Sequence, residues 1–84
     1  MMYQIVIDRY AKKQLSKIPR PHFNRIVKAI EDLSLNPRPV GFKKFTGRPG
    51  YRIRIGDYRV IYGIEDTVLS VFVIDIGHRK NIYG

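Results

Sequence analysis

The stretch YRIRIGDYRVIY, residues 51–62, alternates apolar or aromatic side chains with arginines on both sides of a Gly-Asp pair. Such alternation is typical of a β-strand that buries one face and exposes the other. Gly56-Asp57 is a signal for a tight hairpin turn, because glycine tolerates the positive φ that such turns require. The sequence therefore predicts a β-hairpin at this point.

A two-residue turn fixes which residues of the two strands lie opposite each other. It pairs Arg54 with Arg59, and it puts Arg52 and Ile61 on the same face. Like charges directly opposite one another destabilise a sheet. Guanidinium groups suit phosphate oxygens, so this face predicts an anion site; the alternative is that the arginines simply extend into water. The opposite, core face would carry Tyr51, Ile53, Ile55, Tyr58, Val60 and Tyr62.

Two helices are predicted ahead of this hairpin. Residues 3–7 are β-branched or aromatic and predict a first strand, after which Asp8 can cap a helix. Pro21 suits the first turn of a second helix, because its missing N–H costs nothing there. The apolar residues at helical spacing are Ala11, Leu15 and Ile18 in the first helix and Phe23, Ile26, Val27, Ile30 and Leu33 in the second.

The remaining segments complete an α+β fold. Residues 36–50 are rich in proline, glycine and basic side chains and predict a connecting loop. The run VLSVFVIDI, residues 68–76, is apolar at almost every position, which is typical of a strand buried on both faces. We expect an N-terminal strand, a two-helix hairpin packed on one face of a mainly antiparallel sheet, and a C-terminal three-stranded meander, all in one domain of residues 1–84.

The composition indicates a polyanion partner and argues against several other classes of function. Sixteen Lys and Arg against seven Asp and Glu give a net charge of +9, which attracts RNA, DNA, ribosomes or an acidic protein. With no cysteine and two histidines, we expect no metal site and no cofactor. The chain has neither a signal peptide nor an apolar run near the ~20 residues that span a bilayer, so we expect a cytoplasmic protein with no membrane partner.

The segment GHRKNIY, residues 77–83, follows the last predicted strand and gathers side chains that can bind and protonate a phosphodiester. The alternative is a basic tail in which Tyr83 only packs. Lys43 and Lys44, in the long loop, either follow a phosphate backbone or remain solvated. The candidate residues of the C-terminal segment are His78, Arg79, Lys80 and Tyr83.

GYRIRIGDYRVIY, followed by a β-rich run and GHRKNIY, resembles the RelE/ParE superfamily of bacterial and archaeal toxins over essentially the whole chain. The resemblance implies a ribosome-dependent endoribonuclease that cuts mRNA in the ribosomal A site and inhibits translation. It also implies a RelB-like antitoxin partner, for which the charge predicts an acidic segment, and contact with operator DNA only through that antitoxin. A ParE-like toxin, which inhibits DNA gyrase without being a nuclease, is the alternative.

The resemblance also implies roles for single residues. Arg52 and Arg54 match basic sheet positions that contact the mRNA backbone, and Lys43, Lys44 and Lys80 are further candidates for RNA binding. Arg59 matches an arginine close to the scissile phosphate. Arg79 matches a second arginine, which stabilises developing negative charge, and Tyr83 matches a tyrosine placed near the attacking 2′-hydroxyl.

The sequence departs from the family pattern at two points. Arg52 and Arg54 stand where some relatives carry lysines, which keeps the charge but removes an amine that can act as a base. In addition, no glutamate is clearly placed on the arginine-bearing face. The proton of the 2′-hydroxyl would then pass to Tyr83 or His78, and the sequence leaves both open. Such a weak acid–base apparatus fits a need for the ribosome to orient the substrate.

Overall fold

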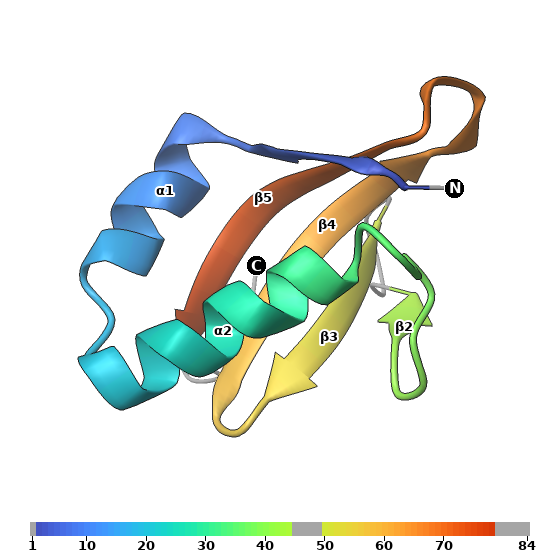
Figure 1. The fold of residues 1–84 in the computed structure, drawn as a ribbon. Coiled ribbons are helices and arrows are strands. Elements are labelled where there is room, and N and C mark those ends of the chain that lie inside the picture. Colours follow the sequence, from blue (N-terminus) through green and yellow to red (C-terminus); the bar gives the residue numbers. More distant parts are fainter. Residues whose placement is uncertain (1, 45–49, 79–84) are drawn as a thin grey trace.

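The computed structural model of this chain describes residues 2–44 and 50–78 (Figure 1). The predicted order of strand, two helices and C-terminal strands is confirmed. The elements are β1 (Gln4–Ile7), α1 (Arg9–Ser16), α2 (Arg20–Asp32), β2 (Lys43–Lys44), β3 (Tyr51–Ile55), β4 (Tyr58–Glu65), the short 3₁₀ helix η1 (Asp66–Val68) and β5 (Ser70–His78).

Within the described ranges, the strands form one five-stranded sheet in the order β1-β5-β4-β3-β2. β1 runs parallel to β5, and the other neighbouring strands are antiparallel, so the predicted mainly antiparallel sheet and its C-terminal meander are confirmed. The loop predicted over residues 36–50 contains a short edge strand, β2, which pairs Lys43 with Arg52 and Lys44 with Tyr51. Two lysines carry no apolar pattern, so this strand could not be predicted.

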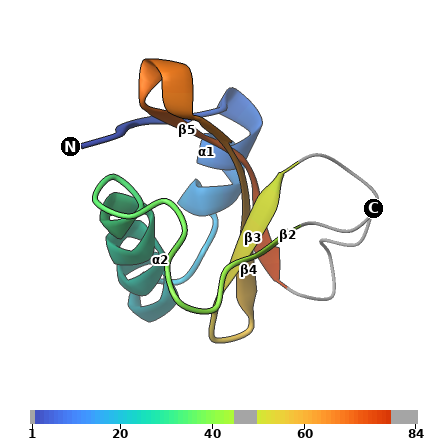
Figure 2. The ribbon, with the colours of Figure 1, turned by 90° about the vertical axis from the view of Figure 1, so that its right-hand side faces the viewer.

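The helices pack on one face of the sheet. Asp8 caps α1 as predicted, since its Oδ2 accepts a hydrogen bond from the backbone N–H of Tyr10 at 3.2 Å. Figure 2 shows α2 along one side of the sheet. No helix in the described part of the chain is long and apolar enough to cross a membrane. The core between helices and sheet is formed by Ala11, Leu15, Ile26, Ile30, Leu33, Ile53, Val60, Tyr62, Val71, Val73 and Ile76.

The predicted hairpin has the predicted register. Gly56 adopts φ +60°, which is the left-handed region that a side chain would strain. Ile55 lies opposite Tyr58, and Arg54 lies opposite Arg59. The turn therefore sets the face on which every arginine of the hairpin lies.

The prediction that the last strand is buried on both faces is wrong. Val71 and Val73 are fully buried under the helices, whereas Phe72 and Ile74 remain 38% and 43% exposed on the other side of the sheet. The apolar composition of β5 therefore does not indicate a second covering layer.

A β-bulge interrupts β5 in its middle. The register passes from Tyr62 opposite Val73 to Ile61 opposite Asp75, which leaves Ile74 as the extra residue. Strict alternation from Val73 would have pointed Asp75 into the core, where a carboxylate is costly. The bulge instead turns Asp75 to the face that the helices leave uncovered.

Candidate functional site

Three arginines from two neighbouring strands gather on the side of the sheet that faces away from the helices. Arg54 and Arg59 are directly opposite each other, and Arg52 lies two residues along β3 on the same side. We call Arg52, Arg54 and Arg59 the arginine face. Lys43 is paired with Arg52 and extends this face to the sheet edge, whereas Lys44 is paired with Tyr51 and points to the other side.

The members of the arginine face differ in exposure. Arg54 is exposed and Arg52 is half-buried, while Arg59 keeps only 9% of its surface accessible. Ile61, next to Arg59 on the same face, is 1% exposed. A guanidinium with so little contact with water is screened less than a surface charge, so it attracts an anion more strongly.

Charge compensation is missing around the outer part of this face. In the described residues, neither Arg52 nor Arg54 takes part in an ion pair, and Arg54 has another arginine directly opposite it. The arrangement costs free energy in the isolated protein. An anion with several oxygens, such as a phosphodiester, relieves this repulsion.

Asp75 is the carboxylate that sequence reasoning missed on this side of the sheet. Its Oδ1 accepts a hydrogen bond from Gln14 Nε2 of α1 at 2.8 Å, and Gln14 Oε1 in turn accepts one from the backbone N–H of Ile76 at 2.8 Å. This double contact fixes α1 to the edge of β5. An acidic residue inside an otherwise apolar strand was the available signal, but its direction depended on the bulge.

His78 does not lie with the arginine face in the structure. It is paired with Tyr58, on the face covered by the helices, and the two ring centroids are 5.5 Å apart. The centroid of the Tyr58 ring also lies 5.2 Å from that of the His22 ring in α2. The Tyr58 ring therefore links the end of β5 to the start of α2.

The other candidates of the C-terminal segment lie outside the described residues. These are Arg79, Lys80 and Tyr83.

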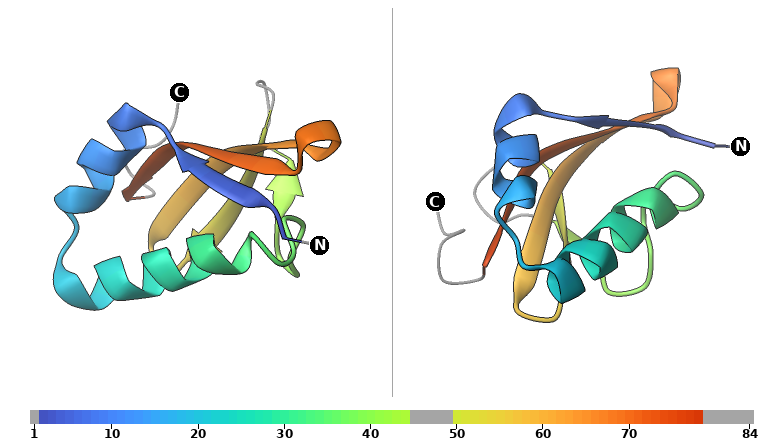
Figure 3. Two further views of the ribbon diagram at one scale, coloured as in Figure 1. Left: turned by 45° about the horizontal axis from the view of Figure 1, so that its top comes forward. Right: turned by 60° about the vertical axis from the view of Figure 1, so that its left-hand side comes forward.

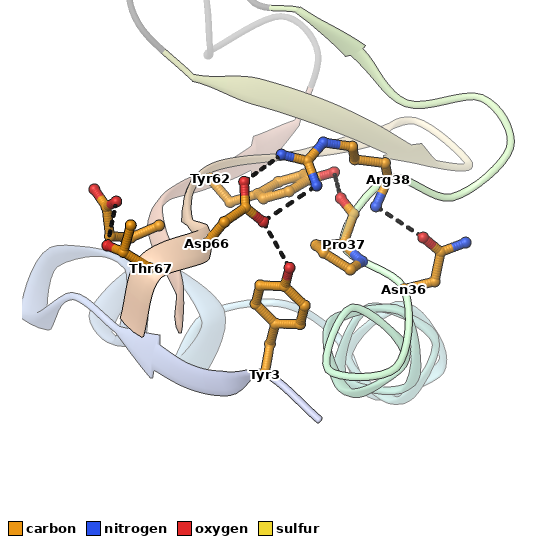
Figure 4. A network of polar contacts seen from close by, with 8 residues as sticks. Tyr3, Asn36, Pro37, Arg38, Tyr62, Asp66 and Thr67 are labelled. Atoms are coloured by element: carbon orange, nitrogen blue, oxygen red, sulfur yellow. Dashed lines mark hydrogen bonds and ion pairs between the residues drawn. The ribbon is translucent and has the colours of Figure 1, made fainter. Parts of the chain in front are cut away.

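A second polar cluster lies on the opposite side of β4, at the end of the sheet nearest η1 (Figure 4). Arg38 donates from Nη2 and Nη1 to the two carboxylate oxygens of Asp66, at 2.9 and 3.4 Å, and the Tyr3 hydroxyl donates to the same carboxylate at 2.6 Å. The buried Tyr62 hydroxyl donates to the carbonyl of Pro37 at 2.7 Å. We call Tyr3, Arg38, Tyr62 and Asp66 the Arg38 cluster.

The pKa values within the Arg38 cluster follow from these contacts. Hydrogen bonds from Arg38 and Tyr3 hold the pKa of Asp66 below its usual value, and the bond to Asp66 raises the pKa of Tyr3. Asp66 likewise raises the pKa of Arg38. Burial raises the pKa of Tyr62 to about 12, so its hydroxyl stays a donor at physiological pH.

Aromatic contacts connect the Arg38 cluster to the edge of the arginine face. The Tyr62 ring lies 6.1 Å from that of Tyr51, which lies 5.6 Å from Phe42. Phe42 directly precedes β2, so this row of rings and the Pro37 contact hold the loop that presents Lys43 beside Arg52. The sequence showed the aromatic residues but not this alignment.

Two hollows open on the described surface, and neither is lined by a residue of the arginine face. One, of about 260 Å³, opens between the helices and β1 and is lined mainly by apolar side chains such as Ile7, Leu15 and Val27. Another, of about 410 Å³, lies between α2 and the end of β3 beside Arg25 and Ile55. In the described part of the chain, no three metal-ligating side chains come together.

Residues 5–83 match the family described as the ParE toxin of the type II toxin-antitoxin system parDE. This chain belongs to the RelE/ParE toxin superfamily. The family resemblance predicted from the hairpin and the C-terminal segment is confirmed, and with it the coarse function, a toxin of a type II toxin-antitoxin system.

Two relatives with RelE-type names match most of this chain. Toxin RelG of Mycobacterium tuberculosis is 32% identical over 99% of this chain and 98% of its own length. Toxin RelE3 of Methanocaldococcus jannaschii is 37% identical, covering 84% of each chain. The RelE toxin in the archaeal RelE-RelB complex from Pyrococcus horikoshii OT3 superposes with a TM-score of 0.81 at 28% identity, over 96% of this chain and 99% of that one. The predicted RelE-like fold is confirmed.

Proposed function

We propose that this toxin is a ribosome-dependent endoribonuclease that cleaves mRNA in the ribosomal A site. The observation that carries the proposal is the arginine face, where like charges are held opposite each other and Arg59 is almost fully buried. In the reaction, the 2′-hydroxyl of the RNA attacks the adjacent phosphorus, and the products are a 2′,3′-cyclic phosphate and a 5′-hydroxyl. DNA lacks the attacking group and would bind without reacting.

The arginines take different parts in this reaction. Arg59, the buried member, contacts the scissile phosphate, where negative charge grows in the transition state and a fixed donor has its largest effect. Arg52 and Arg54, which are more exposed, hold the neighbouring backbone, and Lys43 continues this contact to the sheet edge. Family resemblance assigns Arg79 to the developing charge as well. Lys44 and Lys80 are further candidates for RNA contacts because of their charge.

Proton transfer is assigned to Tyr83 rather than His78. The ring of His78 packs against Tyr58 on the helix side, whereas the scissile phosphate would lie on the side of Arg59. A base must come within hydrogen-bond reach of the proton that it removes. Tyr83 keeps the role that the family resemblance implies for it.

The exposure of Arg54 supports the need for the ribosome. Arg54 is exposed and Arg52 is half-buried, so water competes with the RNA backbone at both positions and these side chains alone orient a flexible strand weakly. Holding the 2′-hydroxyl in line with the leaving oxygen accounts for a large part of such a barrier. The ribosomal A site supplies that orientation.

The partner that restrains the toxin is an antitoxin with an acidic segment. The RelE of the structure from Pyrococcus horikoshii is in complex with RelB, and the charges of Arg52 and Arg54, which take part in no ion pair with the described residues, are complementary to carboxylates. Segments of this kind often fold only on binding. The affinity of the complex should fall as salt screens the charges.

A ParE-like activity remains the second candidate, because the matching family is described by the ParE name. A toxin of that branch would bind DNA gyrase and cleave no RNA. The order of events on induction separates the two: DNA damage signalling before translational arrest favours gyrase.

The proposal is tested by adding the purified chain to ribosomes carrying a defined mRNA and mapping the new 5′ ends. We expect cuts within the A-site codon, only when ribosomes are present. Arg59→Ala should abolish them, and Arg25→Ala, an arginine on α2, should leave them unchanged. No cutting by a folded, growth-inhibiting chain would overturn the nuclease proposal and lead to a gyrase assay.

A further inference from the structure

The outward face of α1 carries a second group of cations that the arginine face does not include. Arg9, Lys12, Lys13 and Lys17 are all exposed, and α1 itself contains no acidic residue. In the described parts of the chain, none of these four side chains takes part in an ion pair or a hydrogen bond. The nearest carboxylate in sequence, Asp8, is used as the helix cap.

An exposed aromatic ring accompanies these cations. Tyr10 is 60% exposed, although most large apolar or aromatic side chains of α1 and α2 face the core. On a helix, residues three and four positions apart are neighbours, so Lys13 lies beside Tyr10 and Lys17 lies beside Lys13. Basic side chains around an exposed ring are the arrangement by which single-stranded nucleic acid is bound, because every base can stack on an aromatic face.

The position of α1 brings this row next to the arginine face. Gln14 is held to the edge of β5 by its contacts with Asp75 and Ile76, and Figure 3 shows α1 beside that strand. Tyr10 and Lys17 lie four and three residues from Gln14, so they flank this attachment point.

The strand that holds α1 is the neighbour of the strand that carries Arg59. Arg59 is paired with Gly77, the residue that follows Ile76 on β5. One strand spacing, about 4.8 Å, therefore separates the strand of the buried arginine from the strand to which α1 is attached.

We propose that Tyr10, Lys13 and Lys17 form a second binding surface for the RNA strand, which continues from the arginine face across the edge of β5. This inference rests on the proposed function and extends its substrate contacts beyond the scissile phosphate. The two surfaces divide the work by residue type. Arginines, with planar forks that bind two oxygens, hold the reacting phosphate, whereas flexible lysines follow the backbone as point charges.

The first test measures binding rather than cleavage, so that it does not depend on catalysis. The probes are 2′-O-methyl single-stranded RNAs of about four and about twelve nucleotides, which lack the attacking hydroxyl and span the usual range of site sizes. The variant is Lys13→Gln with Lys17→Gln. The matched control is Arg25→Gln with Lys28→Gln, which removes two charges from α2.

We expect the variant to bind the short RNA as the unmodified chain does and to bind the long RNA more weakly. The slope of log K against log salt for the long RNA should decrease by about 0.7 for each lysine removed, while the control leaves it unchanged. Tyr10→Ala should lower the affinity for the long RNA about tenfold, because base stacking is lost. Tyr10→Phe, which keeps the ring, should bind the long RNA as the unmodified chain does.

Equal binding of the long RNA by variant and unmodified chain would overturn the inference. A loss of binding only to ribosomes without mRNA would also overturn it, because the surface would then serve ribosomal RNA. Should the variant bind poorly while A-site cleavage by the unmodified chain is absent, the second surface stands and the nuclease proposal fails. The two ideas are therefore tested separately.

Discussion

Arg38 and Arg54 are both accessible arginines, but their surroundings are opposite in sign. Arg38 binds both carboxylate oxygens of Asp66, and the Tyr3 hydroxyl donates a further hydrogen bond to the same carboxylate. Arg54 lies opposite Arg59 and takes part in no ion pair with the described residues. The carboxylate that pairs with Arg38 is supplied by the chain itself, whereas the described residues supply none to Arg54.

Stability and function are served by different regions of this small domain. Local rules of charge pairing are followed where three distant segments must be held together, and they are broken where a ligand is expected. Violations of this kind are expected at functional sites, because the rest of the fold can support them. Substitutions in the two regions should accordingly affect different measurements.

The largest effect is expected at Arg59. Replacing Arg59 by alanine removes a fixed donor from the developing negative charge, and we expect single-turnover mRNA cleavage on ribosomes to fall about 10²–10³-fold. The cleavage rate of Arg59→Lys should fall less, because lysine keeps the positive charge but cannot bind two phosphate oxygens at once. Full cleavage by the alanine variant at equal folded concentration would place the scissile phosphate elsewhere.

The next effect is expected within the Arg38 cluster, on stability alone. Tyr62→Phe leaves the buried carbonyl of Pro37 without its donor, which should lower the free energy of unfolding by about 1–2 kcal/mol in urea denaturation. Tyr58→Phe is the matched control, because the Tyr58 hydroxyl makes no hydrogen bond with the described residues. Equal losses in the two variants would mean that the Pro37 contact contributes nothing.

A smaller change, of opposite direction in two measurements, is expected at Arg54. Arg54→Glu converts a like-charge pair into an opposite-charge pair and should raise the free energy of unfolding by about 0.2–1 kcal/mol. The same variant should bind RNA poorly and lose toxicity. Urea denaturation and growth assays give the two results, and a variant that is both less stable and less toxic would contradict the proposed repulsion.

The smallest effect is the pH dependence contributed by Asp66. Its pKa in the folded protein is lowered, so its contribution is complete above the unfolded value of about 4 and is lost as the pH falls through the folded value. The unfolding midpoint of Asp66→Asn should therefore be lower at neutral pH and should approach that of the unmodified chain in acid. Parallel pH profiles for the two proteins would show that Asp66 is not the titrating group.

The sequence predicted most strongly what is local in the chain. The Gly56-Asp57 turn fixed the pairing of Arg54 with Arg59, and helical spacing located both helices. The bulge at Ile74 escaped prediction, because nothing in an apolar strand marks where its alternation will reset. The side of the sheet on which His78 lies could not be predicted either, because the bulge before it reverses the alternation of side chains along β5.

The Arg38 cluster could not be predicted for a different reason. Tyr3, Arg38 and Asp66 are far apart in the sequence, and a single tyrosine, arginine and aspartate form no motif. Their meeting depends on β1 lying beside β5, a long-range pairing that no local pattern encodes. The edge strand β2 depends on the same packing through Phe42 and Tyr51.

The strand order has a consequence for the folding of this toxin during its synthesis. β1 is synthesised before the other strands and β5 after β4, yet β5 lies between β1 and β4 in the sheet. β1 therefore cannot join the sheet until β5 has been synthesised. Pairings so distant in the chain form late in folding. The neighbouring position of Arg59 and β5 in the sheet is therefore established only after β5 has been synthesised.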